Sequence, residues 1–336
     1  MKYLFELSKE HTTLPKEEIF CLLKTYNIDF KIIFSSNDIL IIETEESEKN
    51  IKKISRRLSS FTYFVDEFLF QSDIDEKIIE KKSDENKIVN KGSIAVKYKN
   101  RSKSVDSKKI VKSLAKIYTK NREVDLVYPD IEIRTVITDE KVFVGQKIYE
   151  INKKSFNSRK VQFRPFFSPI SLHPKIARCL VNLSEIKKDE TLLDPFCGTG
   201  GIILEAGLTG IKIIGSDIEE KMINGCKKTL DHYGIFDYNL FCSDIGKIDD
   251  KIKQVDSVVC DFPYGKSTTT KGENIEKLVD RSFKKISEVL KKDRKAVVGI
   301  NDKNMIKIGE KYLDLLKIHE YIVHGSLTRF FVVFQN

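Results

Sequence analysis

The sequence of 336 residues lacks any CxxC pair, and its five histidines lie far apart along the chain. A zinc site needs several such ligands at short spacing, so we expect no metal centre. Several of the six cysteines lie in apolar runs and are typical of buried thiols in a reducing compartment. The chain also lacks an apolar run long enough to span a bilayer, and its N-terminus lacks an uninterrupted apolar signal segment. These absences predict a soluble, cytoplasmic protein.

The charge balance favours an anionic partner. The chain has 59 Lys and Arg against 50 Asp and Glu, a net charge of +9. Nucleic acid is the most common partner of such proteins, although many basic proteins bind none. Hydrophobic residues make up 40% of the chain, which is enough for folded cores, and the length suggests two or three domains.

The first 150 residues predict two small α+β units. Residues 1 to about 70 alternate short apolar strands with helical patterns around Lys16–Lys24 and Lys49–Leu58, which indicates a ferredoxin-like sandwich. The charged stretch Asp73–Lys91 is typical of a linker or an exposed helix. The second unit follows, with a strand "IAVKYK", a helix near Ser107–Tyr118, and two further strands ending near Tyr149.

Basic residues concentrate between Lys91 and Arg122. This segment has eleven Lys and Arg and a single acid, Asp106, a net charge of +10. Such a run often forms only a solvated face. Because one strand-turn-helix carries all of this charge, we favour a phosphate-binding surface.

From about Pro165 the pattern changes to that of an α/β domain. Short apolar strands, "TLLD", "KIIGSD", "DSVVCD" and "KAVVGI", alternate with helical segments. This alternation predicts a doubly wound, Rossmann-like domain with a mostly parallel sheet and helices on both faces. Two strand-like runs around His324–Ser326 predict an antiparallel pair at the edge of that sheet.

The segment "LLDPFCGTGGIILEAG" has the pattern of a ligand-binding loop between a strand and a helix. Small residues let a ligand approach the backbone, and the helix N-terminus offers N–H groups. A dinucleotide fingerprint would need glycine in place of Ile203, and the lysine of a P-loop is missing. What remains is an acid that opens the loop, Asp194.

Three acids follow successive predicted strands. Asp194 is suited to a cationic ligand such as a sulfonium–ammonium cofactor, Asp217 to a ribose diol, and Asp244 to an exocyclic adenine amine. Any one of them is equally well explained as a helix N-cap. Three acids in this arrangement favour a cofactor site.

The motifs "DPFCGTGG", "GSD" and "DFPYG" resemble those of S-adenosylmethionine-dependent methyltransferases that act on exocyclic amines of nucleic-acid bases. The chain more closely resembles the archaeal tRNA guanosine N2-methyltransferases that modify position 10, which carry a THUMP domain before the catalytic domain. "VDLVYPDIEIRTVI", "RPFFSPISLHPKIARCLVNLS" and the terminal "VHGSLTRFF" support this resemblance, whereas the first 70 residues match only in size and style. It implies tRNA as partner and S-adenosylmethionine as cofactor, bound by Asp194, Phe196, Cys197, Gly198, Thr199, Gly200, Asp217, Ile218 and Asp244.

The stretch "VVCDFPYGKST" has the residues needed to hold a planar amine. A guanine N2 amine is a poor nucleophile, so two acceptors must orient it and one must take its proton. We expect the Asp261 carboxylate and a backbone carbonyl of the Phe262–Pro263 turn to do this. Pro263 stiffens the turn, and Tyr264 offers a ring on which a flipped base stacks. The plain alternative is a strand-end turn with Asp261 as a cap.

Phe262 is the departure from the family pattern, which usually has a second proline there. Phenylalanine restores an N–H and loosens φ, so the residue is either tolerated, for example by stacking beside the base, or it slows the site. We favour tolerance, because Asp261, Pro263 and Tyr264 are all present.

The leading hypothesis is therefore a tRNA guanine-N2 methyltransferase. We predict a ferredoxin-like domain at 1–72, a THUMP domain at 73–150, a linker at 151–165 and a methyltransferase domain at 166–336. The alternatives are a non-catalytic tRNA-binding subunit and a DNA or RNA adenine-N6 methyltransferase. The number of methyls added, the oligomeric state and the need for an activating subunit stay open. The predicted phosphate contacts are Lys97, Lys99, Arg101, Lys103, Lys108, Lys109 and Lys112.

Overall fold

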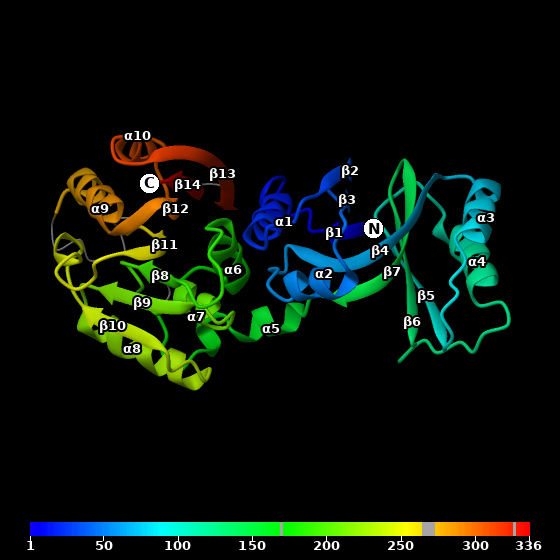
Figure 1. Ribbon diagram of the computed structural model, residues 1–336, viewed down its shortest axis with the longest axis horizontal. Helices are drawn as coiled ribbons and strands as arrows, with labels where there is room; N and C mark the ends of the chain where they lie inside the picture. The colour runs from blue at the N-terminus through cyan, green and yellow to red at the C-terminus, as the bar shows by residue number, and fades with distance from the viewer. Residues whose placement is uncertain (169–170, 264–272, 325–326) are drawn as a thin grey trace. The chain divides into compact units, whose positions relative to one another are not determined.

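The computed structural model describes residues 1–168, 171–263, 273–324 and 327–336. The chain divides into two compact units (Figure 1). Unit 1 comprises Met1–Lys9, Ile28–Arg56 and Thr62–Ile151, and unit 2 comprises Glu10–Asn27, Arg57–Phe61 and Asn152–Asn336. None of the helices in the described residues has the length and apolar character needed to cross a lipid bilayer.

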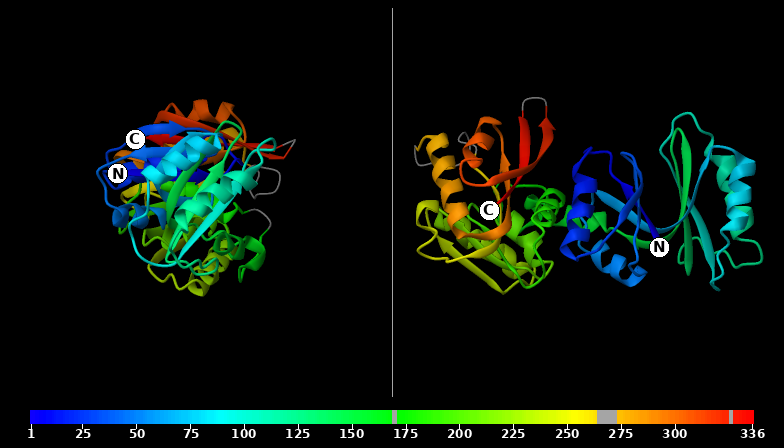
Figure 2. Two further views of the ribbon diagram at one scale, coloured as in Figure 1. Left: turned by 90° about the vertical axis from the view of Figure 1, so that its right-hand side faces the viewer. Right: turned by 45° about the horizontal axis from the view of Figure 1, so that its top comes forward.

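The described residues of unit 1 form one seven-stranded sheet with the strand order β2-β3-β1-β4-β7-β6-β5. Helices α3 and α4 lie side by side on one face of it (Figures 1 and 2). Apolar residues at helical spacing bury that face, with Ile79 of α3 and Leu114 of α4 packed on Ile94 and Ile133. The elements are β1 (Lys2–Leu7), β2 (Lys31–Ser35), β3 (Ile39–Glu43), α2 (Glu48–Ser55), β4 (Thr62–Asp73), α3 (Glu76–Glu85), β5 (Ile94–Asn100), α4 (Ser107–Tyr118), β6 (Ile131–Ile137) and β7 (Lys141–Glu150).

Helices α3 and α4 of unit 1 begin at side-chain caps. Asp75 accepts a hydrogen bond from the backbone N–H of Ile78 and starts α3, inside the charged stretch for which a helix was one prediction. Asp106, the single acid of the basic segment, accepts a hydrogen bond from the N–H of Lys108 at 3.0 Å and starts α4. This acid therefore fixes where the basic helix begins.

Unit 2 is an α/β unit with a mixed sheet of order β10-β9-β8-β11-β12-β14-β13 in the described residues. The neighbouring strands β10, β9, β8, β11 and β12 run parallel to one another. Strand β14 runs antiparallel to both β12 and β13. The elements are α1 (Leu14–Thr25), α5 (Lys153–Ser158), α6 (Pro174–Leu183), β8 (Thr191–Asp194), α7 (Gly201–Gly207), β9 (Lys212–Asp217), α8 (Glu220–His232), β10 (Tyr238–Cys242), β11 (Val255–Asp261), α9 (Ile275–Val289), β12 (Leu290–Ile300), α10 (Asn304–Gly309), β13 (Asp314–His324), β14 (Leu327–Gln335) and two short 3-10 turns, η1 (Val161–Phe163) and η2 (Ile245–Lys247).

Helices cover both faces of this sheet, as the alternation of strands and helices predicts. Leu192 of β8 packs in one core with residues of α6, α7 and α8, and the next residue, Leu193, packs in a second core with α9 and α10. The predicted antiparallel pair is also confirmed, with β13 at the edge of the sheet. Parallel strands place their carboxyl ends at one edge, and the strand order reverses between β8 and β11.

Helix α1 is the main difference from the predicted organisation. Its sequence pattern was assigned to the first small domain, but Leu14 and Cys21 pack in the core of unit 2 beside α6. The buried carboxylate of Glu18 accepts hydrogen bonds from the Ser59 N–H at 2.8 Å and from Asn182 at 2.7 Å. The predicted boundary between residues 72 and 73 falls at the end of β4, inside the continuous sheet of unit 1, and stays a prediction.

Candidate active site

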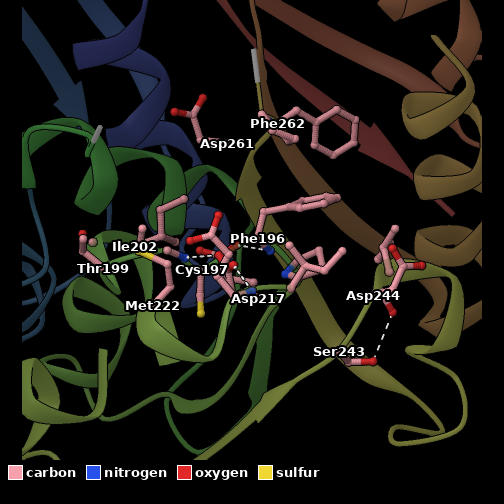
Figure 3. A pocket seen from close by; sticks show the side chains of 18 of the residues that line it. Phe196, Cys197, Thr199, Ile202, Asp217, Met222, Ser243, Asp244, Asp261 and Phe262 are labelled. Carbon is pink, nitrogen blue, oxygen red and sulfur yellow. Dashed lines mark hydrogen bonds between the residues drawn. The ribbon is translucent and has the colours of Figure 1, made fainter. Parts of the chain in front are cut away.

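The carboxyl edge of the unit 2 sheet borders a cavity of about 530 Å³. Figure 3 shows side chains from the ends of several neighbouring strands around it. The cavity brings together most of the residues predicted for the cofactor and the amine. These are Asp194, Phe196, Cys197, Gly198, Thr199, Asp217, Ile218, Asp244, Asp261 and Pro263.

The loop after β8 is shaped by two glycines with positive φ. Gly198 (φ +49°) borders open space, since a Cβ there would meet no atom within 4 Å, so a ligand has room to approach its backbone. Gly200 (φ +81°) is not among the residues that border the cavity, so its predicted cofactor contact stays a prediction. A Cβ at Gly200 would lie 2.6 Å from the Cys226 sulfur, so packing on α8 requires glycine there. Gly200 is also the N-cap of α7.

Asp194 ends β8 and is almost completely buried, with 2% of its surface exposed. Its Oδ1 accepts a hydrogen bond from the Phe196 N–H at 3.1 Å. Burial raises the pKa of Asp194 well above its usual range, and the charges of Asp217 and Asp261 raise it further. A cationic ligand in the cavity would offset both effects.

Asp217 ends β9 and holds the glycine loop in place. Its Oδ2 accepts a hydrogen bond from the Gly198 N–H at 3.0 Å, and its Oδ1 accepts one from the Glu219 N–H at 2.9 Å. Burial raises the pKa of Asp217, and these amide donors oppose the rise. Because a carboxylate oxygen has two lone pairs, both oxygens keep capacity for hydroxyl donors.

Asp244 lies two residues beyond β10 and is bound by an arginine that sequence reasoning missed. Arg281 of α9 contacts both oxygens of Asp244, with Nη2 at 2.9 Å from Oδ2, and it also pairs with Glu273 at 2.7 Å. The hydrogen bond from Arg281 is the main reason why the pKa of Asp244 is lowered. Asp244 is also the N-cap of a 3-10 turn, since its Oδ1 accepts from the Gly246 N–H. The capping and cofactor interpretations are therefore compatible.

Asp261 ends β11 and faces the same cavity. Its Oδ2 lies 3.1 Å from Nη1 of Arg329 on β14, and both side chains are mostly buried. Arg329 belongs to the terminal "LTRFF" run, which supported the family resemblance but had no assigned role. That run was the only sequence signal that pointed to this residue.

Phe262 packs in the core and also borders the cavity, so its predicted place beside a bound base stays a prediction. Its ring is 2% exposed and makes edge-to-face contacts with Phe196 and Phe283, with ring centroids 5.3 and 5.2 Å away. Its N–H, which proline would lack, donates to the Gly299 carbonyl at 2.9 Å. Pro263 follows at the cavity wall, and Tyr264 lies outside the described residues.

The predicted phosphate contacts do not form one surface. Ile94 and Val96 pack under α4, so the alternation of β5 places Lys97 and Lys99 on the opposite face of the sheet from α4. Lys97 pairs with Glu132 at 2.8 Å. Arg101 is mostly buried and pairs with Glu6 at 2.6 Å, so the structure does not support it as a phosphate contact. The exposed members of the set around α4 are Lys103, Lys108, Lys109 and Lys112.

Two family models match the chain. One, described as RMKL-like, methyltransferase domain, matches residues 162–330, which contain the cavity. A second, described as DNA methylase, matches residues 2–228. TrmN from Thermus thermophilus has the same fold, with a TM-score of 0.60 and 16% identity over all of both chains. SMU.472, solved in complex with SAH, matches 99% of this chain and 98% of its own with a TM-score of 0.56 and 13% identity. Fold and site thus define a methyltransferase.

Two relatives identify the family. The chain is 37% identical over 285 residues to the tRNA (guanine(10)-N2)-dimethyltransferase of Methanothermobacter thermautotrophicus, covering 83% of this chain and 82% of the relative. It is 36% identical over 233 residues to the enzyme of the same name from Pyrococcus abyssi, covering 67% of this chain and 69% of the relative. The chain belongs to the tRNA (guanine(10)-N2)-dimethyltransferase family.

Proposed function

We propose that this enzyme transfers methyl groups from S-adenosylmethionine to the exocyclic N2 of a guanosine in tRNA, at position 10. The main support from the structure is that Asp261 and Pro263 border the same cavity as the loop after β8. An acceptor for an amine and a site for a cationic methyl donor are therefore adjacent. The two relatives that are 37% and 36% identical to this chain over the aligned residues carry the names of dimethyltransferases, so we expect two methyls at N2.

The residues around the cavity fit the cofactor. Asp194 has a raised pKa in a neighbourhood of acids, so a sulfonium–ammonium ligand suits its charge. Asp217 would accept hydrogen bonds from the ribose diol, and Oδ2 of Asp244, with a lone pair beyond its bond to Arg281, would accept from the adenine amine. S-adenosylmethionine supplies an electrophilic methyl group when it is bound. The protein supplies orientation and, through Phe196 and the buried loop, exclusion of water.

Asp261 would act on the amine of the target base. Its carboxylate and a backbone carbonyl of the Phe262–Pro263 turn would accept the two N2 hydrogens and turn the nitrogen lone pair toward the methyl donor. Asp261 would then take the proton that the amine releases on methylation. The hydrogen bond from the Phe262 N–H to the Gly299 carbonyl holds this strand end, so phenylalanine is compatible with an ordered turn. We expect Tyr264 to stack on the flipped base.

Unit 1 would bind the tRNA through a THUMP-type module. The exposed lysines of α4 and the turn before it, Lys103, Lys108, Lys109 and Lys112, are the phosphate contacts that the structure supports best. Such contacts position an RNA without reading its sequence. Selection of the target nucleotide would then depend on tRNA shape.

The experiment that tests this function is methyl transfer from labelled S-adenosylmethionine to an unmodified tRNA transcript, followed by nucleoside mapping. We expect label on N2 of the guanosine at position 10, and a decrease of about 10²–10⁴-fold in kcat for Asp261→Asn with cofactor affinity retained. Label on N2 of another guanosine would support guanine-N2 methylation but refute position 10 as the target. Because of the DNA methylase match, a DNA duplex is assayed in parallel, and transfer to adenine there would favour that alternative.

A further inference from the structure

The ion pair between Arg329 and Asp261 joins the last strand of the chain to the proposed amine acceptor. Nη1 of Arg329 lies 3.1 Å from Oδ2 of Asp261, and the side chains are 14% and 16% exposed. Removing two charges from water to this extent is costly unless they are paired. An aspartate at a strand end otherwise rotates freely about its side-chain bonds, so this contact restricts the carboxylate.

The topology explains why a residue 68 positions further along the chain reaches Asp261. Strand β12 runs parallel to β11, with Asp261 opposite Gly299. Strand β14 runs antiparallel to β12, with Phe331 opposite Gly299 and Phe330 opposite Ile300. The start of β14 therefore lies at the carboxyl edge of the parallel strands. Arg329 and Phe331 point to the same face because their spacing is two residues.

Gly299 leaves the space that this contact needs. It lies between Asp261 on β11 and Phe331 on β14, in the interior of a seven-stranded sheet where glycine weakens a strand. A Cβ at Gly299 would lie 2.3 Å from Oδ1 of Asp261, so any other residue would displace the carboxylate. The missing side chain gives Arg329 a path across β12 to Asp261.

We propose that Arg329 is a positioning residue for the methyl transfer, and that Gly299 provides the space in which it orients the Asp261 carboxylate. The contact on Oδ2 restricts the rotation of the carboxylate, which sets the direction from which it can accept a hydrogen bond from an amine. This gives the terminal "LTRFF" run a role in the reaction. The inference rests on the proposed function, because it assumes that Asp261 orients the amine.

The test compares Arg329→Gln with wild type in methyl transfer to the tRNA transcript. We expect kcat to fall about 10²-fold, the typical cost of a misplaced reacting group, while KM for tRNA and the Kd of S-adenosylmethionine by calorimetry change less than about threefold. Arg329→Lys should recover part of kcat, because it keeps the charge but not the planar fork. The matched control is Arg294→Gln, which removes an arginine from β12 that pairs with Glu190. Its kcat should equal that of wild type.

A double-mutant cycle separates positioning from a general loss of structure. In an Asp261→Asn background, Arg329→Gln should reduce kcat less than about threefold, since the carboxylate that it orients is absent. A full 10²-fold decrease in both backgrounds would overturn the inference. So would a rise in KM for tRNA with unchanged kcat, which would make Arg329 a substrate contact instead.

Gly299→Ala gives a second route to the same question without removing a charge. We expect kcat to fall at least tenfold with Arg329 intact, and a value equal to that of wild type would contradict the proposed space. If Arg329→Gln does not fold, this variant and Arg329→Lys carry the test. Failure of the proposed function and failure of the inference about Arg329 give different results. Wild-type protein without transfer to tRNA refutes the proposed function, whereas active wild type with an equally active Arg329→Gln refutes only the inference.

Discussion

The sheet of unit 1 and the cavity edge of unit 2 bury carboxylates in different ways. In unit 1, Glu6 lies between Arg101 and Arg134, and Arg134 also pairs with Asp66. In unit 2, the buried Asp194 accepts a hydrogen bond from a backbone N–H. The negative charges of Asp217 and Asp261 raise its pKa.

The difference separates acids that arginines pair within the fold from the acids that we propose as cofactor contacts. Burying a carboxylate costs free energy unless a cation or several donors compensate for the lost water. In unit 1, Arg101 and Arg134 supply that compensation for Glu6, whereas burial still raises the pKa of Asp66 to about 7 beside Arg134. In unit 2, acids cluster at the edge of a cavity, where a cationic ligand would supply it, and strongly perturbed acids in a cleft are typical of functional sites.

The largest effect that we expect is on stability, from Glu6→Ala in unit 1. The substitution leaves the guanidiniums of Arg101 and Arg134 buried together without the carboxylate between them. Breaking a buried ion pair in this way costs about 3–5 kcal/mol in free energy of unfolding. Urea unfolding measures this cost. Calorimetry on the folded variant should show unchanged affinity for S-adenosylmethionine, and lost affinity would show that the two groups of acids are not independent.

Asp194→Asn in unit 2 should show the opposite pattern. The amide is neutral and its oxygen still accepts from the Phe196 N–H, so stability should be unchanged or increased, while affinity for S-adenosylmethionine falls about 10–100-fold.

The pH dependence of Asp194 gives a second readout. A raised pKa means that the folded state binds this proton more tightly than the unfolded state, so stability falls as pH rises from the usual aspartate value near 3.8 through the folded pKa. Affinity for the cationic cofactor should increase over the same range, because the ionised form binds it. In Asp194→Asn both pH dependences should flatten. A wild-type affinity that does not change with pH would contradict the assigned role.

Substitutions can also test which exposed lysines of unit 1 contribute to tRNA binding. Replacing Lys108, Lys109 and Lys112 on α4 by Gln should lower tRNA affinity. The slope of log K against log salt should decrease by about 2, because each lost phosphate contact contributes about 0.7–0.9. The control replaces three exposed lysines of another helix in unit 1, Lys49, Lys52 and Lys53 of α2. An equal loss in both variants would indicate that only net charge matters.

The smallest effect concerns Glu18 of α1, a buried acid of unit 2 outside the cavity. Burial raises the pKa of Glu18 to about 7, so the stability that its protonated form contributes is complete below about 4.5 and is lost as pH rises through about 7. Glu18→Gln mimics the neutral form and can still bond Ser59 and Asn182. We expect nearly equal stability at pH 5 and a variant that is more stable than wild type at pH 8, where wild type must ionise the buried carboxyl. Thermal unfolding at the two values measures this, and a variant less stable at pH 8 would show that the charge itself is needed.

Local patterns determined much of the fold. The strands "TLLD" and "KIIGSD", the capped helix Ser107–Tyr118 and the strands at the edge of the sheet lie where the sequence predicts them. The acids Asp194, Asp217 and Asp261 end their strands, so their meeting at one edge followed once the sheet was predicted to be parallel. Each of these signals needs only a few neighbouring residues.

What the sequence by itself determined is therefore the order of most elements, because side-chain periodicity and turn chemistry are local properties, and the class of enzyme, because its motifs resemble those of the family to which the chain belongs. The tertiary structure alone decided that α1 packs in unit 2, that Arg101 is held by Glu6, and that Arg281 and Arg329 reach Asp244 and Asp261. These contacts join residues 37 to more than 90 positions apart, and they depend on strand order and direction. A charged residue in a sequence does not reveal whether its partner will be phosphate, water or a buried acid, since that depends on which distant strand the fold places beside it.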